Sequence, residues 1–334
     1  MREMANDIPK YVPFEGEDKE LAAKYIPTCK VGWVKIGEKK WVLPYTFAEK
    51  GAAVYNMKPR PDDTWVVTYP RSGTTWTLEL VWLVANDMNF EGAKNQSLHH
   101  RFPFVDLDLI TSHFQPTATE TDALALKINP ALADSLPSPR FIKSHMSFDL
   151  LPNLLDSGCK VVYVARNPKD LVVSWYNFQK DMKEIQYQGT FEEFCDYFMR
   201  DLCLYSPYWP HLKDAWAERH RPNLLYIFYE ELKSDLPGTI KKVAKFFDKS
   251  YKDEEIAKLV DHLHIDNFRK NPMVNSPSPK VRDALQPSLF IRQGKVGGWK
   301  EVFTPELEAK FDAWIKENLK DTDFVFPVNV VQEK

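Results

Sequence analysis

Residues 68–76 read Thr68-Tyr69-Pro70-Arg71-Ser72-Gly73-Thr74-Thr75-Trp76, and this stretch decides the fold. It overlaps the end of an apolar strand predicted over 64–69 and the start of a helix predicted over 75–86. A loop between a strand and a helix exposes backbone N–H groups at the positive end of the helix, and such groups bind phosphate. The GxxxxGK[ST] pattern of the Walker A loop is absent. The stretch therefore predicts a P-loop-like strand–loop–helix that binds an anion.

The side chains of this loop suit an anionic ligand with a nucleobase. Gly73 permits close approach of the backbone, Arg71 adds a fixed positive charge, and the hydroxyls of Ser72, Thr74 and Thr75 add hydrogen-bond donors. Trp76 offers an aromatic face on which a base can stack. Serine and threonine at this place also serve as plain helix caps. On the loop alone, the anion site and the cap are equally good interpretations.

Three further apolar segments are predicted to be buried strands, over 140–143, 160–165 and 223–228. Their near-continuous apolar runs are typical of parallel strands covered on both faces by helices. Each segment ends at polar or aromatic side chains, which are Lys143 and His145, Arg166, and Tyr229. Because the carboxyl ends of parallel strands lie along one edge of a sheet, we expect these groups to meet there. This placement favours a binding site over a set of helix caps.

The chain is predicted to be one α/β domain over 31–330, with a central, mostly parallel sheet flanked by helices, after a polar leader over 1–30. A short hairpin is expected over 31–36 and 40–43. Segments 111–139 and 270–290 are rich in Pro, Ser, Thr and Asn and are predicted to be long loops. Helices are predicted over 75–86, 169–180, 191–202, 236–247, 254–263 and 305–319.

The composition excludes several classes of protein. With 334 residues, 44% hydrophobic and 27% charged, the chain can form a large core without disulfides or metals. A formal net charge of −3 argues against nucleic acid as a partner. The four cysteines show neither a CxxC pair nor zinc-type spacing, and no segment has the length of a membrane span. The N-terminus has no apolar signal region, so we expect a cytoplasmic protein without membrane contact.

Taken together, the motifs resemble the cytosolic sulfotransferase family. The family's phosphosulfate loop is approximately TYPKSGTTW, from which residues 68–76 differ only by Arg71 in place of Lys. The other matching segments occur in order and with compatible spacing between Trp65 and Asp323. They are Lys143-Ser144-His145, Tyr163 to Ser174, Phe228-Tyr229-Glu230, Lys270-Asn271-Pro272-Met273 and Arg292-Gln293-Gly294-Lys295-Val296-Gly297-Gly298-Trp299-Lys300. Insect relatives with Arg in the loop, of a branch associated with retinol dehydration, also resemble this sequence.

The resemblance implies a donor, 3′-phosphoadenosine 5′-phosphosulfate (PAPS), whose product is PAP, and it implies transfer without a metal. His145 would be the general base, a task that suits imidazole because its ordinary pKa lies near neutrality. Lys143 and Arg71 would stabilise charge around the transferred group. The donor would be held by residues of the loop and of three later segments. They are Arg71, Ser72, Gly73, Thr74, Thr75, Trp76, Arg166, Ser174, Tyr229, Arg292, Gln293 and Gly294.

The acceptor is expected to be a small apolar molecule with a hydroxyl group, such as a phenol, a sterol or another alcohol. Phe104 is a predicted acceptor contact; the aromatic residues 175, 176 and 178 are equally well explained as core. The other seven histidines are expected to be structural or exposed. Two departures from the family pattern are Gln293 in place of Lys and Leu263-His264 where Thr and Ser are frequent. The dimer motif KxxxTVxxxE is half matched, with Lys300 and Thr304 present, so a homodimer by that route is not predicted.

Three alternatives stay open from the sequence. A dehydratase of the same fold would act on a retinoid-like alcohol through a sulfonated intermediate and release an unsaturated product. A nucleotide kinase is disfavoured by the missing Walker A pattern and by the Lys143–His145 pair. A protein that only binds PAPS or a lipid would not need that pair.

Overall fold

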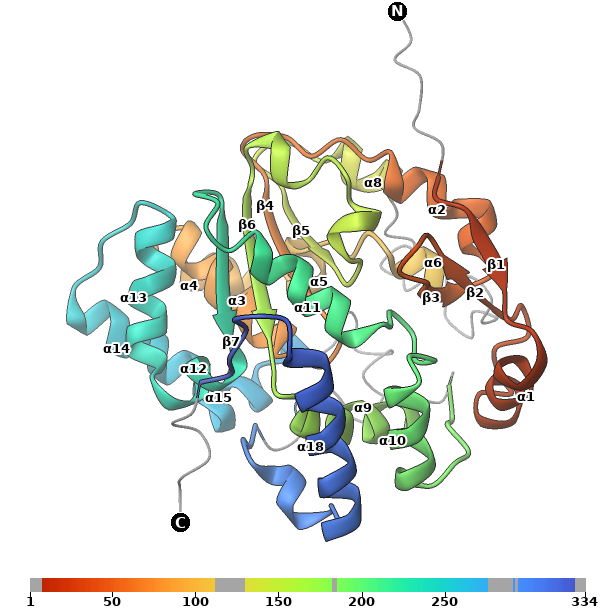
Figure 1. The fold of residues 1–334 in the computed structure, drawn as a ribbon. Helices are drawn as coiled ribbons and strands as arrows, with labels where there is room; N and C mark the ends of the chain where they lie inside the picture. Colours follow the sequence, from red (N-terminus) through yellow and green to blue (C-terminus); the bar gives the residue numbers. More distant parts are fainter. Residues whose placement is uncertain (1–7, 112–129, 182–184, 276–290, 292–293, 328–334) are drawn as a thin grey trace, which may run out of the picture.

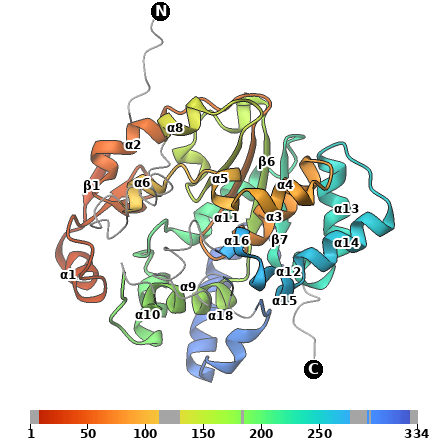
Figure 2. The ribbon, with the colours of Figure 1, turned by 180° about the vertical axis from the view of Figure 1, so that it is seen from behind.

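The computed structural model describes residues 8–111, 130–181, 185–275, 291 and 294–327, and Figures 1 and 2 show its ribbon from two opposite sides. The long predicted loops fall largely outside these residues, as do Arg292 and Gln293.

A parallel sheet of four strands lies at the centre of the molecule (Figure 1). Its strands are β4 (Thr64–Thr68), β5 (Phe141–Ser144), β6 (Lys160–Ala165) and β7 (Leu224–Phe228). The order across the sheet is β5-β4-β6-β7, and every neighbouring pair is parallel. The predicted strands and their parallel arrangement are thereby confirmed, with bounds shifted by at most one residue. The chain leaves β4 at the point where the order reverses, which is where open parallel sheets bind ligands.

Both faces of this sheet are buried, and successive side chains of β4 alternate between two cores. Trp65 and Val67 belong to the larger core, and Val66 between them belongs to the smaller one. Figure 1 shows α11 and α18 on the side of the larger core, and Figure 2 shows α3 and α4 on the opposite side. The runs of apolar residues in the strands follow from this double coverage.

Three antiparallel strands form a second sheet, in the order β1-β2-β3. The predicted hairpin corresponds to β2 (Trp33–Ile36) and β3 (Trp41–Pro44). The segment expected to be a polar leader contributes β1 (Tyr11–Pro13) and α1 (Gly16–Tyr25). Phe14, Ala22 and Tyr25 are buried in the larger core, so this part of the chain packs with the rest of the fold.

Helices cover the central sheet and its edges. Those that the sequence predicted are α3 (Thr74–Ala85), α9 (Pro168–Asp181), α10 (Phe191–Met199), α13 (Leu236–Phe246), α14 (Asp253–Leu263) and α18 (Pro305–Leu319). Other helices were not predicted. They are α2 (Phe47–Tyr55), α4 (Phe90–Asn95), α5 (Leu98–Arg101), α6 (Leu107–Thr111), α8 (Pro130–Ser135), α11 (Tyr208–Ala217), α12 (Tyr229–Ser234), α15 (Ile265–Lys270) and α16 (Pro272–Asn275). Short 3₁₀ turns are η1 (Phe148–Leu150), η2 (Leu155–Ser157) and η3 (Gly298–Glu301).

Candidate active site

The loop after β4 has the geometry of an anion site. Arg71 has φ 68° and Gly73 has φ 97°, and α3 begins directly after this left-handed turn. The side chain of Ser72 is fully buried, and its Oγ has no hydrogen-bond partner among the described residues. Thr74 Oγ1 lies 2.7 Å from Thr68 Oγ1, so this hydroxyl is already engaged within the fold. A buried hydroxyl without a partner at the start of a helix of 12 residues is suited to an anionic ligand.

Glycine is required at position 73 for two separate reasons. Its φ lies in the left-handed region that other residues enter at a cost. A Cβ placed there would lie 2.5 Å from Cδ2 of Tyr229, the first residue of α12. The rings of Tyr229 and Trp76 are 6.0 Å apart, and Trp76 Nε1 donates to the carbonyl oxygen of Leu263 at 3.0 Å. The two predicted nucleobase contacts therefore lie together beside the loop.

Two residues from later segments, Ser174 and Arg166, lie against Arg71 of the loop, and all three were predicted to bind the sulfuryl donor. Arg71 Nε donates to Ser174 Oγ at 3.1 Å, and one Arg166 nitrogen donates to the carbonyl oxygen of Arg71 at 2.9 Å. The Arg166 guanidinium also lies over the Tyr229 ring at 4.3 Å, while its buried Nε lacks a partner among the described residues. Pro168 begins α9, and Ser174 is the seventh residue of that helix. The arrangement concentrates two guanidinium charges and a hydroxyl at one edge of the sheet.

His145 follows β5 and is held in one tautomer. Its Nδ1 donates to the carbonyl oxygen of Thr68 at 2.7 Å, since a carbonyl only accepts. Burial, with the Lys143 charge nearby, holds the pKa of His145 well below its usual range. The imidazole is therefore neutral near pH 7, and Nε2 keeps its lone pair. A neutral imidazole with that lone pair available can accept a proton.

Lys143 on β5 lies against the predicted acceptor contact. Its Nζ is 3.9 Å from the centre of the Phe104 ring, and the edge of that ring faces His145 at 5.1 Å between centroids. Burial lowers the pKa of Lys143 to about 8, with the Asp106 carboxylate opposing and the Arg71 charge adding to the shift. Phe104 and Lys143 are also paired through their backbones. The cation, the base and one aromatic wall are thus adjacent.

Other groups around His145 were not identified from the sequence. Asp106 is buried, and its carboxylate accepts from the backbone N–H of His145 and from Ser144 Oγ, each at 2.7 Å. Burial raises the pKa of Asp106 to about 6. His211 on α11 donates from Nε2 to the His145 carbonyl oxygen at 3.0 Å. The sequence signal for Asp106 was its place just after Phe104; His211 had been grouped with the structural histidines.

The glycine-rich segment near residue 297 is anchored through α9. The two carboxylate oxygens of Asp170 accept from the backbone N–H groups of Gly297 and Trp299, at 2.7 and 3.0 Å. Gly294 has φ 61°, and a Cβ there would meet Ile265 at 3.1 Å. The predicted ligands Arg292 and Gln293 lie outside the described residues.

The aromatic residues after Ser174 divide between the core and the site. Trp175 is buried and stacks on Phe178 at 5.6 Å between centroids. Phe178 in turn lies under the Arg71 guanidinium at 4.7 Å. Tyr176 packs against Phe191 of α10 at 5.4 Å. Phe178 is therefore the member of this group that borders the anion site.

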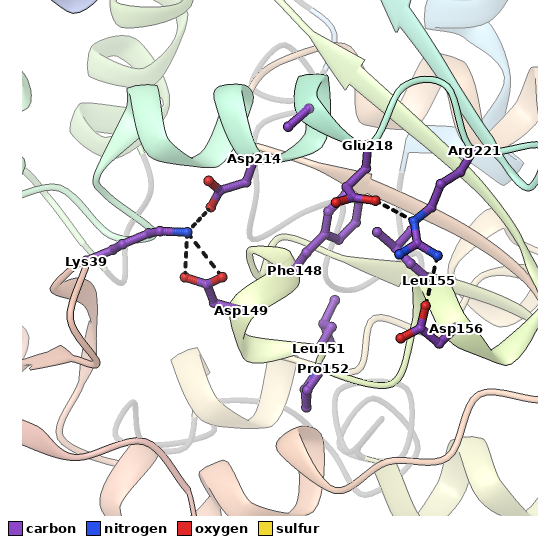
Figure 3. A pocket seen from close by; sticks show the side chains of 11 residues that line it. Lys39, Phe148, Asp149, Leu151, Pro152, Leu155, Asp156, Asp214, Glu218 and Arg221 are labelled. Atoms are coloured by element: carbon purple, nitrogen blue, oxygen red, sulfur yellow. Dashed lines mark hydrogen bonds and ion pairs between the residues drawn. The ribbon is translucent and has the colours of Figure 1, made fainter.

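A separate pocket of about 300 Å³ opens near η1 and α11 (Figure 3). Its charged side chains already pair with each other: Lys39 bridges Asp149 and Asp214, and Arg221 bridges Asp156 and Glu218. None of the predicted site residues lines it. No cluster of metal-binding side chains and no helix fit to cross a membrane occurs within the ranges that the structure describes.

Comparisons with known proteins agree with this geometry. The sulfotransferase domain family matches residues 61–323. Luciferin sulfotransferase of Photinus pyralis is 33% identical over 312 residues, which cover 90% of this chain and 82% of that protein. Sulfotransferase 1B1 of Mus musculus is 34% identical over 288 residues, covering 86% of this chain and 92% of the mouse protein.

Among solved structures, retinol dehydratase in a complex with retinol and PAP matches with a TM-score of 0.86 and 33% identity. The match covers 96% of this chain and 100% of that one. Retinol dehydratase in complex with androsterone and PAP gives the same TM-score and identity.

Proposed function

The chain belongs to the sulfotransferase family, and we propose that it moves a sulfuryl group from PAPS to a hydroxyl of a small apolar acceptor with His145 as general base. Proteins of the same family, including luciferin sulfotransferase, match most of its length. The single observation that carries the proposed mechanism is the state of His145: buried, neutral, and donating from Nδ1 to Thr68. That leaves Nε2 as the acceptor of a proton.

The residues beside the loop fit a donor with two phosphate groups. Ser72 Oγ and Arg166 Nε are buried without partners among the described residues, so oxygens of a bound ligand would give each of them a hydrogen-bond partner. We infer that Arg71, Ser72, Thr75 and the start of α3 hold the 5′-phosphosulfate. Arg166 and Ser174 would hold the 3′-phosphate, and Trp76 with Tyr229 the adenine. When bound, PAPS supplies the sulfuryl group and PAP leaves.

Lys143 and Arg71 supply positive charge where negative charge develops. Sulfuryl transfer resembles phosphoryl transfer, in which positioning and electrostatics account for most of the catalysis. With a pKa of about 8, Lys143 is mostly protonated near pH 7. His145 accepts the proton of the acceptor hydroxyl as the new oxygen–sulfur bond forms and the bond to the phosphate oxygen breaks. The side chains proposed for these roles lie at the carboxyl-terminal edge of the central sheet.

The acceptor is proposed to be a phenol, a sterol or another alcohol, because the wall beside His145 is aromatic. Phe104 and Tyr205 both present ring edges or faces to His145, at 5.1 and 5.5 Å between centroids. An apolar wall with one polar end positions a hydroxyl without competing hydrogen bonds.

The test compares a His145→Ala variant with the parent protein. We expect the variant to lose turnover by at least about a hundredfold, which is the usual contribution of a general base. Its thermal stabilisation by PAP should stay close to that of the parent, because His145 is not among the proposed donor ligands. Unchanged turnover would contradict the proposed mechanism, and a parent that PAP does not stabilise would contradict the proposed donor.

A second candidate is dehydration of an alcohol through a sulfonated intermediate. It is favoured by the match of 96% of the chain to retinol dehydratase. In that reaction the sulfonated alcohol loses sulfate and a proton, and an alkene is released. Incubating the protein with labelled PAPS and either retinol or a panel of phenols, followed by mass spectrometry, separates the two. A sulfonated retinol as the final product excludes dehydration.

We propose that the single sulfotransferase domain extends N-terminally beyond the predicted bounds of 31–330 to include β1 and α1, and that it does not dimerise through the half-matched KxxxTVxxxE motif. Thr304, one of the two matching residues, accepts from the backbone N–H of Leu307 and so caps α18. Its presence is explained within the subunit. Sedimentation equilibrium of the protein before and after a Lys300→Glu substitution tests this, since an unchanged mass is expected.

A further inference from the structure

The backbone N–H and the carbonyl oxygen of His145 are both hydrogen-bonded to side chains. Its N–H donates to Asp106 at 2.7 Å, and its carbonyl oxygen accepts from Nε2 of His211 at 3.0 Å. The ring is fixed separately through Nδ1 and the Thr68 carbonyl. Three hydrogen bonds to three different segments therefore determine where Nε2 of His145 points.

The protons on His211 follow from its partners. The His145 carbonyl can only accept, so Nε2 of His211 carries the hydrogen. Burial lowers the pKa of His211 to about 4, and the ring is therefore neutral near pH 7 with an unprotonated Nδ1. The hydroxyl of Tyr163 lies 2.7 Å from that Nδ1 and 3.0 Å from the His211 carbonyl oxygen, and because both of these groups only accept, Tyr163 donates to this pair. Tyr163 thus selects the tautomer in which His211 donates to His145.

The surroundings of His211 leave it little freedom. It is buried, and the edges of Trp41 and Tyr69 meet its ring at 5.9 and 5.6 Å between centroids, both nearly at right angles. The charged group that bears on it is Asp149, which accepts from Trp41 Nε1 at 3.2 Å and belongs to the pocket wall in Figure 3. Among the described residues, His211 meets the loop through the ring of Tyr69, which is not a proposed ligand, and it meets the proposed base through the His145 carbonyl oxygen.

We propose that His211 is a positioning residue for the general base, and this rests on the proposed role of His145. Its hydrogen bond fixes the peptide plane after His145 and thereby the direction of the Nε2 lone pair. A shift of about 1 Å in a reacting group can cost roughly a hundredfold in rate. A histidine that merely fills the core would affect stability and leave the direction of His145 unchanged.

The test uses three substitutions at His211. In His211→Gln the side-chain amide can still donate to the His145 carbonyl, so kcat should stay within about threefold of the parent. His211→Leu fills similar space without a donor, and in His211→Asn the amide is too short to reach. Both should lose kcat by about tenfold or more at unchanged KM for either substrate, since a positioning fault acts on the chemical step.

A second measurement does not depend on turnover. The ¹⁵N NMR signals of the His145 ring, recorded without ligand, should show one Nδ1–H tautomer in the parent and in His211→Gln. In His211→Leu and His211→Asn they should show a mixture. Asp149→Asn is the matched control, because it alters the packing behind His211 and leaves its hydrogen bonds intact; kcat should not change.

The outcomes separate this inference from the proposed function. If His145→Ala keeps its turnover, the role of the general base is wrong. If His145→Ala is inactive while a folded His211→Leu or His211→Asn keeps the parent's kcat and ring signals, only the positioning role is wrong. A loss of kcat in Asp149→Asn equal to that of His211→Leu would also overturn it, because loosened packing would then suffice.

Discussion

The loop over residues 69–73 and the surroundings of His145 lie at the same edge of the central sheet, but they are built in different ways. The loop is one continuous stretch, and its shape comes from Arg71 and Gly73 in the left-handed region and from the helix that follows. His145 is held by Thr68, Asp106 and His211, which are far apart in sequence. The donor side is therefore a local structure, and the base side is assembled by tertiary packing.

Substitutions in the loop and substitutions around His145 should therefore affect different steps of the reaction. A change within the loop should alter donor binding directly, because the backbone N–H groups of the loop are proposed to bind the phosphosulfate. A change at a residue that holds His145 should leave donor binding intact and reduce the rate of the chemical step. Single substitutions on either side test whether donor binding and the chemical step are separable in this way.

Gly73→Ala should have the largest effect. It forces Ala into φ 97° and brings a Cβ within 2.5 Å of Tyr229, beside the loop that is proposed to bind the donor. We expect a loss of about 3 kcal/mol in unfolding free energy and no measurable stabilisation by PAP. Gly158→Ala is the matched control, with φ 81° and no atom within 4 Å of the new Cβ. It should lose only about 1 kcal/mol and bind PAP normally.

Denaturation by urea gives both unfolding free energies, and thermal shifts give PAP binding. If Gly73→Ala behaves like Gly158→Ala in both measurements, the close packing of Tyr229 on the loop contributes neither to stability nor to PAP binding. Adding Tyr229→Ala to Gly73→Ala should cost less than the sum of the two single substitutions, because the clash is then removed.

Arg166→Ala should weaken the donor site without affecting the base. Arg166 lies over Tyr229 at 4.3 Å and donates to the loop, and its unpartnered Nε is proposed to face the 3′-phosphate. Losing charged hydrogen bonds to a phosphate should raise the KM for PAPS by roughly 10- to 100-fold. Arg219→Ala is matched to it, since Arg219 also lies over an aromatic ring, Trp216, at 4.3 Å. Steady-state kinetics should show no change in the control.

An equal KM for PAPS in both arginine variants would contradict the donor role of Arg166. An Arg166→Ala variant with lower kcat and unchanged KM would show that a change on the donor side also impairs the chemical step.

The same contrast explains what could be predicted from the sequence. The strands, the parallel sheet and the loop were predictable because buried runs and the Ser72-Gly73-Thr74-Thr75 pattern are local. His145 and Lys143 were predictable because strand ends share one edge. The helix α11 was not predicted, since Pro207 and Pro210 and its aromatic residues obscure the period. With α11 unplaced, nothing in the sequence could connect His211 to His145.

Asp106 illustrates the same limit with a charged residue. A lone Asp in a sequence is normally exposed, and only the fold reveals that its carboxylate accepts from His145 and Ser144. The segment predicted to be a polar leader shows the same limit, because its residues Phe14 and Tyr25 are buried in the larger core. Their apolar side chains are too few and too scattered to show a helical period.

Asp106→Asn should affect the base side alone. An amide offers one acceptor oxygen where the carboxylate offers two, so either the His145 N–H loses its acceptor or the Ser144 hydroxyl must turn to accept from the new amide. We expect kcat to fall by about tenfold, with PAP stabilisation unchanged. A fall in PAP stabilisation equal to that in Arg166→Ala would contradict the separation of the two sides.

The pH dependence of stability adds a second measurement for Asp106. Its pKa is about 6 in the fold against 3.8 ordinarily, so the folded state binds the proton more tightly than the unfolded state. The cost of burying the charge, roughly 3 kcal/mol, is fully present above pH 6 and disappears as the pH falls from 6 toward 4. Relative to Asp106→Asn, the parent should therefore gain stability over that window. Urea denaturation at several pH values measures the difference.

Lys143→Arg should give the smallest effect, a change in the shape of a pH profile. The pKa of Lys143 is lowered to about 8 by burial, and only its protonated form supplies positive charge beside Phe104 and His145. The parent's kcat/KM should fall above about pH 8, approaching tenfold per pH unit, because kcat/KM reports groups of the free enzyme. Arginine stays protonated throughout this range, so the variant should lack that decline even if its rate is lower at pH 7.

Lys160→Arg is the control for this substitution. Lys160 is at the opposite, amino-terminal end of β6 and lies over the Phe246 ring at 5.0 Å, so it resembles Lys143 in packing alone. Its variant should keep the parent's profile. A decline above pH 8 that persists in Lys143→Arg would assign the titration to another group and detach Lys143 from the base side. Its absence would place the cation and the base in one unit, which the donor loop reaches through the charge of Arg71 and through the ring of Tyr69 on His211.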